Sequence, residues 1–294
     1  MNEVTRGPLR FYGGGWMRAK WTLGYVPRHP ELTTWVDLCF GAGSITARKE
    51  VWPNEIINDR DGRVINFMKV LRDDDLAARL VELINLTPWA EDEMRECLAI
   101  SDDPLEDARR FFAICWMSVH GGPTAQYASF RFQKSAENRH VAPAYDAIDR
   151  HDLLAFGRRL KKVHVFNRDA IGLIKKYGVV DTAVQYFDPP YLRKTRARKN
   201  GYRYEVSAAW HRLAAYWLRK ARGPVLVAGY RSRLYERCYE DYGWQRVERE
   251  QKTNGKSTAI ECLWLSPITL FWLERQQEMK VAEAYPLLAL ADQL

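Results

Sequence analysis

Cysteine is scarce in this sequence, and long apolar runs are absent. The five cysteines are scattered along the chain and no two form a CxxC pair, so neither a zinc site nor a disulfide framework is expected. Scattered thiols of this kind favour a reduced, cytoplasmic setting. The longest apolar stretch, near residues 111–119, is too short to span a bilayer. Residues 1–10 carry charges but no apolar segment, so we expect no secretory signal and no membrane partner.

Nucleophile sets and metal-ligand spacings are also missing. No Ser/His/Asp or Cys/His set is evident, and His211 lies in an expected helix, where a packed role is favoured over a catalytic one. We therefore expect no bound metal ion and no hydrolase of the covalent type. The chain also lacks internal repeats and low-complexity tracts, which argues against a solenoid or a disordered scaffold.

What the chain does have is a positive charge and enough length for a substantial core. Its 294 residues, 47% hydrophobic and 28% charged, suit one large α/β domain with an inserted subdomain. The formal net charge of +8 favours a polyanionic partner, chiefly nucleic acid or an anionic membrane. The alternative is a basic soluble protein without such a partner.

Strand-like and helix-like segments alternate along the chain. The strand-like runs cover residues 34–38, 55–59, 163–166, 183–187, 225–228 and 260–265. Helices are predicted over about 62–72, 104–119, 208–220 and after 267. Asp103 and Ser207 are the expected N-caps of two of them. The alternation predicts a largely parallel sheet, in which the last two strands could be antiparallel. Residues 85–145 change character, and we interpret them as an insertion.

The sharpest motif is Asp188-Pro189-Pro190-Tyr191, which directly follows the apolar strand 183–187. Two consecutive prolines stiffen the turn, so it can aim a carboxylate and a backbone carbonyl at one point. An exocyclic amino group needs two such acceptors, Asp188 and the Pro189 carbonyl, before it can attack a methyl sulfonium. Tyr191 could stack on the base. The alternative is a rigid surface turn.

Three carboxylates and a glycine turn are candidates for holding a cofactor. Asp37 is followed by Gly41 and Gly43 after the first strand, where glycines let a ligand approach the backbone, although many such turns are merely tight. Asp59 ends the second strand and could accept hydrogen bonds from ribose hydroxyls. Asp169 could accept a bond from an adenine amino group. For Asp59 and Asp169 the alternative is an acid at a helix N-terminus, a role that Asp61 suits better.

A basic run follows the Asp-Pro-Pro-Tyr motif. It includes Arg193, Lys194, Arg196, Arg198, Lys199 and Arg203, with Tyr202 and Tyr204 between them. Cations beside a base-binding pocket would neutralise phosphates. The alternative is a solvated loop.

Taken in order over residues 9–267, these motifs resemble the Dam-like class of DNA adenine-N6 methyltransferases, particularly the phage and prophage type. The resemblance adds a Gly-rich opening with Phe11, Gly13, Gly14 and Gly15, and the segments 58–61, 167–169, 229–235 and 261–264. It implies a Rossmann-like methyltransferase sheet with helices on both faces, S-adenosylmethionine as cofactor, and duplex DNA as partner, entered by flipping the adenine. It places Phe11 and the glycines near the cofactor, Asp59 at its ribose and Asp169 at its adenine.

The resemblance also implies a domain plan. Residues 1–84 and 146–267 would form a discontinuous catalytic domain, residues 85–145 a mostly helical target-recognition insertion, and residues 268–294 a C-terminal helical extension. Candidates for DNA contacts in the insertion are Arg131, Lys134 and Arg139. We expect a monomer or a weak dimer, and a cognate restriction enzyme is one candidate partner.

Two positions depart from the family pattern. Gly15 stands where the family usually has Lys, and Cys39, with Phe40 beside it, replaces the family's Phe. The missing Lys could weaken activity, or Arg18 or Lys20 could supply its charge. The alternatives to an active adenine methyltransferase are a DNA-binding member that does not methylate and an amino methyltransferase acting on cytosine, RNA or glutamine. Asp188 at the first motif position favours adenine.

Overall fold

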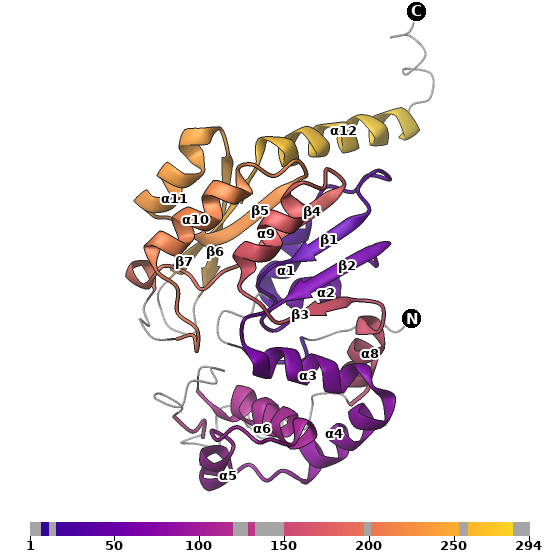
Figure 1. Ribbon diagram of the computed structural model, residues 1–294, viewed down its shortest axis with the longest axis vertical. Helices are drawn as coiled ribbons and strands as arrows, with labels where there is room; N and C mark the ends of the chain where they lie inside the picture. Colours follow the sequence, from indigo (N-terminus) through magenta and orange to yellow (C-terminus); the bar gives the residue numbers. More distant parts are fainter. Residues whose placement is uncertain are drawn as a thin grey trace, which may run out of the picture.

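A mixed seven-stranded sheet lies at the centre of the protein (Figure 1). The computed structural model describes residues 7–11, 16–119, 129–132, 150–196, 201–252 and 258–284. The strands are β1 (Thr34–Asp37), β2 (Asn54–Asn58), β3 (His164–Phe166), β4 (Ala183–Phe187), β5 (Val225–Tyr230), β6 (Gln245–Lys252) and β7 (Thr258–Leu265). Their order is β3-β2-β1-β4-β5-β7-β6. The first five are parallel, whereas β7 is antiparallel to both β5 and β6.

Helices cover both faces of this sheet because side chains alternate along each strand. Val36, Phe187 and Val227 pack against α9 (Ala170–Gly178), α10 (Ala208–Leu218) and α11 (Arg233–Cys238). The neighbouring residues Trp35 and Leu226 point to the other face, which α1 (Trp16–Leu23), α2 (Ser44–Arg48) and α12 (Pro267–Ala284) cover. The predicted α/β fold is therefore confirmed.

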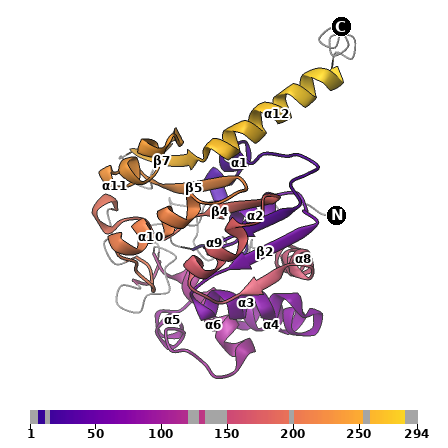
Figure 2. The same cartoon turned by 45° about the horizontal axis from the view of Figure 1, so that its top comes forward.

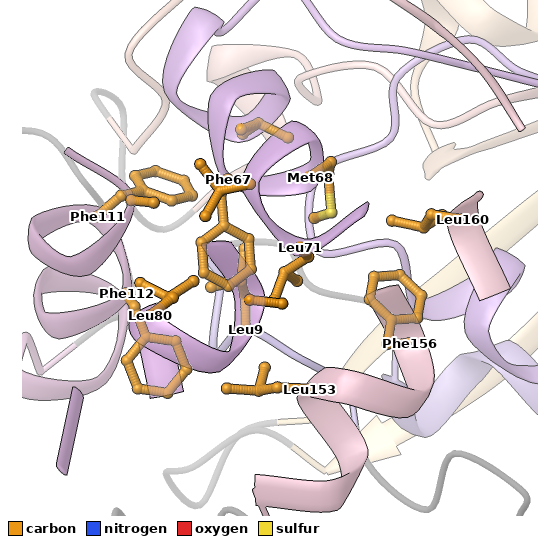
Figure 3. Packing of buried hydrophobic residues seen from close by; sticks show 14 of the residues in the cluster. Leu9, Phe67, Met68, Leu71, Leu80, Phe111, Phe112, Leu153, Phe156 and Leu160 are labelled. Atoms are coloured by element: carbon orange, nitrogen blue, oxygen red, sulfur yellow. The ribbon is translucent and has the colours of Figure 1, made fainter. Parts of the chain in front are cut away.

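A third core lies beside β2 and joins helices from distant parts of the chain (Figure 3). The helices are α3 (Gly62–Arg72), α4 (Asp74–Leu86), α6 (Pro104–Met117) and α8 (Arg150–Leu160), with α5 (Glu91–Glu96) against α6. Phe67 of α3 stacks on Phe112 of α6 with ring centroids 6.1 Å apart, and Phe156 of α8 belongs to the same cluster. The expected insertion thus begins with helices that share a core with α3. Its boundaries at residues 85 and 145 stay a prediction.

Most predicted elements and caps are confirmed, whereas several elements were not predicted, among them β6 and the helices α1, α4, α8 and α11. Asp103 accepts a hydrogen bond from the Leu105 amide, and Ser207 accepts one from the Trp210 amide, as expected of N-caps. The antiparallel pairing of the last two predicted strands is also confirmed. Strand β6 was missed because its residues, QRVEREQK, carry almost no apolar signal. Helix α4 was missed although it has Asp73 as a side-chain N-cap.

The predicted helix after residue 267 is confirmed as far as Ala284. It is tied to the sheet at its start, where the Val225 amide donates to Thr269 Oγ1 at 2.9 Å, and it then extends away from the sheet (Figure 2). In the described part of the chain, no helix has the length and apolar content needed to cross a membrane.

The turn after β1 requires glycine at Gly43. Its φ of +69° lies in the left-handed region, and a Cβ added there would be 2.5 Å from Phe40 Cζ and 2.9 Å from Phe156 Cζ. The left-handed backbone of the turn and the close packing of Phe40 and Phe156 therefore both require a residue without a Cβ at position 43.

Replacing this glycine should destabilise the fold. We expect Gly43→Ala to lower the free energy of unfolding by about 2–4 kcal/mol, from left-handed strain and overpacking together. Gly172→Ala is the matched control, because a Cβ on this helical glycine would meet nothing within 4 Å and should stabilise α9 by about 0.5–1 kcal/mol. Urea unfolding measures both changes. Equal stability of Gly43→Ala and the wild type would contradict the packing described here.

Candidate active site

The candidate site lies where the sheet order reverses between β1 and β4. From β1 the chain continues to β2 on one side, and from β4 it continues to β5 on the other. In doubly wound sheets ligands bind at this point, outside the carboxyl ends of the strands. A pocket with about 950 Å³ of open space, including its mouth, lies here. It is lined by the loops after β1, β2, β3 and β4 and by residues 202–204 and 206, so its place suits a small-molecule ligand.

Asp59 connects the glycine turn to the start of α3. Its Oδ2 accepts a hydrogen bond from the Gly41 amide, and its Oδ1 accepts one from the Asp61 amide, both at 2.8 Å. Burial raises the pKa of Asp59 to about 6, although these amides act in the opposite direction. Asp61 caps α3 by accepting from the Arg63 amide, which confirms its structural role. Asp59 therefore lines the pocket as a fixed acceptor.

Asp37 ends β1 and is almost completely buried at the pocket wall, with 2% of its surface exposed. Thr46 Oγ1 lies 3.4 Å from its Oδ2, but its Oδ1 has no hydrogen-bond partner among the described residues. Burial raises the pKa of Asp37 well above its usual value, and the nearby Asp188 and Asp59 raise it further. An unpaired buried acceptor of this kind suits a cationic or hydrogen-bonding ligand.

Asp169 caps α9 and also lines the pocket, and its contact with a cofactor stays a prediction. Its Oδ1 accepts from the Ile171 amide at 2.9 Å and so caps α9, while its Oδ2 accepts from Trp210 Nε1 at 3.0 Å. The side chain is nevertheless partly exposed and lines the pocket. Capping does not prevent this carboxylate from meeting a ligand.

Two asparagines that were not singled out hold the loops together. Asn58 Nδ2 donates to the carbonyls of Leu38 and Arg168 at 3.0 and 3.1 Å. Asn167 Nδ2 donates to the Asp59 carbonyl at 2.8 Å. The sequence feature that could have identified them is their position next to the candidate residues Asp59 and Asp169. They fix the loops after β1, β2 and β3 relative to one another.

The Asp-Pro-Pro-Tyr motif follows β4, as predicted, and brings Asp188 and Pro190 to the pocket wall. Arg18 of α1, buried with only 5% of its surface exposed, forms an ion pair with Asp188 Oδ2 and donates to the Tyr191 hydroxyl. Its Nη1 also lies 3.1 Å from Glu261 Oε2 on β7. Tyr191 donates to the same Glu261 oxygen at 3.0 Å. The sequence named Arg18 only as an alternative to the missing Lys and gave Glu261 no role.

Tyr191, which is expected to stack on the target base, is buried in this structure. Its ring is 6% exposed and packs edge-on against Tyr230, with centroids 4.8 Å apart. It is not among the residues that line the pocket. A nearby expectation is confirmed: His211 is buried, with Nδ1 3.1 Å from the Tyr235 hydroxyl, and burial lowers the pKa of His211 to about 4.

The basic run after the motif divides into two parts. Arg193, 55% exposed, and Lys194 face solvent. Arg196, expected to contact DNA, is instead buried and paired with Glu205, and it lies over the Tyr202 ring. That expectation is corrected, because this guanidinium is used within the loop. Residues 202–204 line the pocket, where Arg203 Nη1 is 3.2 Å from Asp61 Oδ1.

Several expected site residues can be placed only in part. Phe11, Gly41, Cys39 and Phe40 line the pocket. Arg131 is partly buried, and its carbonyl accepts from Trp89 Nε1 at 3.0 Å. The remaining predicted residues, Gly13, Gly14, Gly15, Lys134, Arg139, Arg198 and Lys199, lie outside the described residues.

Comparison with known proteins agrees with this geometry. The sequence profile of the D12 class N6 adenine-specific DNA methyltransferases matches residues 12–253, which include the Asp-Pro-Pro-Tyr motif and every pocket residue except Phe11, but not β7 or α12. No individual curated protein matches the chain. The match spans most of the sequence and confirms the Dam-like resemblance, the Rossmann-like fold and DNA as the substrate. The chain therefore belongs to the D12 class N6 adenine-specific DNA methyltransferase family.

Proposed function

We propose that this enzyme transfers a methyl group from S-adenosylmethionine to N6 of an adenine flipped out of duplex DNA at a specific site. One observation carries the proposal: Asp188 lines the same pocket as Asp37, Asp59 and Asp169, at the carboxyl ends of adjacent strands. The acceptor for a target amino group and the acceptors for a cofactor thus share one space. A flipped base is the form in which an enzyme can reach this atom.

The pocket residues fit S-adenosylmethionine. Its sulfonium and ammonium groups are cations, and the unpaired Oδ1 of the buried Asp37 is an acceptor that such a ligand would satisfy. Asp59 is proposed to bind the ribose hydroxyls, and Asp169 the adenine amino group. Phe11 and the glycine turn would contact the rest of the cofactor. When bound, this cofactor supplies an electrophilic methyl group.

Asp188 and the Pro189 carbonyl are proposed to accept the two N–H bonds of the target amino group. Holding both hydrogens favours a more tetrahedral nitrogen with an available lone pair, aimed into the pocket. Tyr191 is proposed to stack on the flipped base. Because its ring is buried against Tyr230, stacking requires a local movement of the motif when the base enters.

DNA would be held by the basic surface near this pocket. Exposed Arg193 and Lys194 follow the motif directly, so they are placed to bind phosphates beside the flipped nucleotide. Residues 85–145, with Arg131, Lys134 and Arg139, are proposed to recognise the target sequence. The net charge of +8 supports binding to a polyanion.

Replacing the proposed acceptor should strongly slow methylation. We expect Asp188→Asn to lower kcat for methyl transfer by about 10²- to 10³-fold, the loss typical of one preorganised hydrogen-bonding group. Labelled transfer and nucleoside mass spectrometry of treated DNA provide the measurement, with N6-methyladenine as the expected product. Appearance of N4-methylcytosine, or full activity of Asp188→Asn, would contradict the proposal.

Cofactor binding should depend on the ionisation of Asp59. With its pKa raised to about 6, the carboxylate is mostly protonated at pH 5 and ionised above pH 7, so affinity for S-adenosylmethionine should rise with pH. If only the ionised form binds, Kd should fall about tenfold from pH 5 to pH 7.5. Calorimetry at each pH measures this. Asp59→Asn is the control, and a step near pH 6 that persists in this variant would exclude Asp59 as its source.

The exposed cations should set part of the salt dependence of DNA binding. Each phosphate contact contributes about 0.9 to the slope of log K against log salt, so replacing Arg193 and Lys194 with Gln should reduce that slope by about 2. The matched control replaces Arg275 and Lys280 of α12 with Gln, which removes the same charge from a helix that leads away from the sheet. Fluorescence anisotropy at several salt concentrations measures both. If the slope fell equally in the two variants, the change would reflect net charge alone, and phosphate contacts by Arg193 and Lys194 would be contradicted.

A further inference from the structure

Four polar side chains from three distant segments meet behind the catalytic motif. Arg18 comes from α1, Asp188 and Tyr191 follow β4, and Glu261 comes from β7. The two terminal nitrogens of the guanidinium have different partners: Nη2 binds Asp188, whereas Nη1 binds the Tyr191 hydroxyl and Glu261. Arg18 and Glu261 are separated by 243 residues in the chain. Their meeting is therefore a product of the fold and not of local sequence.

Burial of these charged groups would destabilise the protein if any of them lacked a partner. Arg18 is 5% exposed and Glu261 7%, and buried charges destabilise a protein unless each is paired and hydrogen-bonded. Here one guanidinium serves two carboxylates and a phenol. Its planar fork suits this task, since a Lys ammonium is a single point charge that cannot hold two separated partners in one plane.

Asp188 faces Arg18 on one side and the pocket on the other. The side chain keeps 19% of its surface exposed and lines the pocket. Asp188 thus contacts Arg18 and the pocket at the same time. Lys20, the other cation considered for the missing charge, lies on the exposed side of α1 and has no such contact among the described residues.

We propose that Arg18 is a positioning residue for methyl transfer: it holds the Asp188 carboxylate and the Tyr191 hydroxyl in place, and Glu261 in turn orients its guanidinium. Arg18 then supplies the positive charge that the family's Lys would carry and that Gly15 lacks. The proposal rests on the role proposed above for Asp188. It assigns to Arg18 and Glu261 an effect on the reaction that exceeds their effect on folding.

The electrostatics of the motif give the proposal a distinctive signature. Burial raises the pKa of Asp188, Arg18 lowers it, and Glu261 raises it. A carboxylate must be ionised to offer all its oxygen lone pairs to an amino group. The other titratable groups coupled to Asp188 are Asp37 at the end of β1, Cys39 in the following turn, Tyr186 of β4, Tyr191 of the motif and Tyr235 of α11. The two positioning residues therefore act on Asp188 with opposite sign.

The test compares Arg18→Met, Arg18→Lys and Glu261→Gln by kcat, KM for DNA, Kd for S-adenosylmethionine and the pH dependence of kcat. Arg18→Met should lower kcat about 10- to 100-fold, a usual loss when the group that orients a site residue is removed, and should move the acid limb of the pH profile upward. Glu261→Gln should move that limb downward. Arg18→Lys should keep the limb near its wild-type position with an intermediate kcat. Cofactor Kd should change less than about threefold in all three.

Lys49→Met is the matched control for removing a buried cation. Lys49 is also buried and paired with a carboxylate, Glu55, but at the opposite end of the strands. It should lower the unfolding temperature and leave kcat unchanged.

If Arg18→Met also loses only stability, with wild-type kcat and pH profile in the folded protein, the proposal is overturned. Should that variant not fold, unmoved kcat and acid limbs in both Arg18→Lys and Glu261→Gln overturn it equally. An active Asp188→Asn would remove the proposed function itself, whereas an inactive Asp188→Asn beside a fully active Arg18→Met would remove only the role of Arg18.

Discussion

The parallel pairing of β1 with both β2 and β4 is the constraint on which the site depends. Val36 lies opposite Ile56 on one side and Gln185 on the other, so three strands end at the same edge of the sheet. This register brings Asp37, Asp59 and Asp188 together although 151 residues separate the first from the last (188 − 37). Side chains on both faces of β1 are buried, which holds the register because a one-residue slip would move each side chain into the opposite core.

A carboxylate-rich pocket within a positively charged protein separates two binding tasks. The acids that line the pocket, Asp37, Asp59, Asp61, Asp169 and Asp188, outnumber the lining arginines Arg60, Arg168 and Arg203, which favours a ligand that carries some positive charge. The overall charge of +8 favours the opposite kind of partner. Burial raises the pKa of Asp37 and Asp59 and so disfavours their charged form, which makes their ionisation depend on what enters the pocket.

The sequence predicted local features well and long-range ones poorly. Strand 183–187, helix 62–72 and the caps Asp103 and Ser207 follow from short-range patterns, and they are confirmed. The family resemblance supplied the order of the motifs. Strand β6 was missed because an edge strand with alternating charges owes its structure to its neighbour β7.

Burial of polar side chains could not be predicted from the sequence. Arg196 sits in a basic run like its neighbours, yet its partner Glu205 takes it out of solvent. Arg18 and Tyr191 gave no sign that they would meet Glu261, because such contacts depend on the assembled sheet. A charge run or an aromatic after a motif therefore indicates chemistry, but its exposure is decided by tertiary structure.

The placement of Glu261 on β7 has a consequence for the order of folding. Contacts between residues far apart in the chain form late, since a long loop must close before they can be made. During synthesis α1 leaves the ribosome early, while β7 emerges only after the other strands. Until then Arg18 has one of its two carboxylate partners at most. Completion of the polar cluster thus coincides with completion of the sheet, and in a nascent chain Arg18 and Tyr191 lack Glu261 while the last strand is missing.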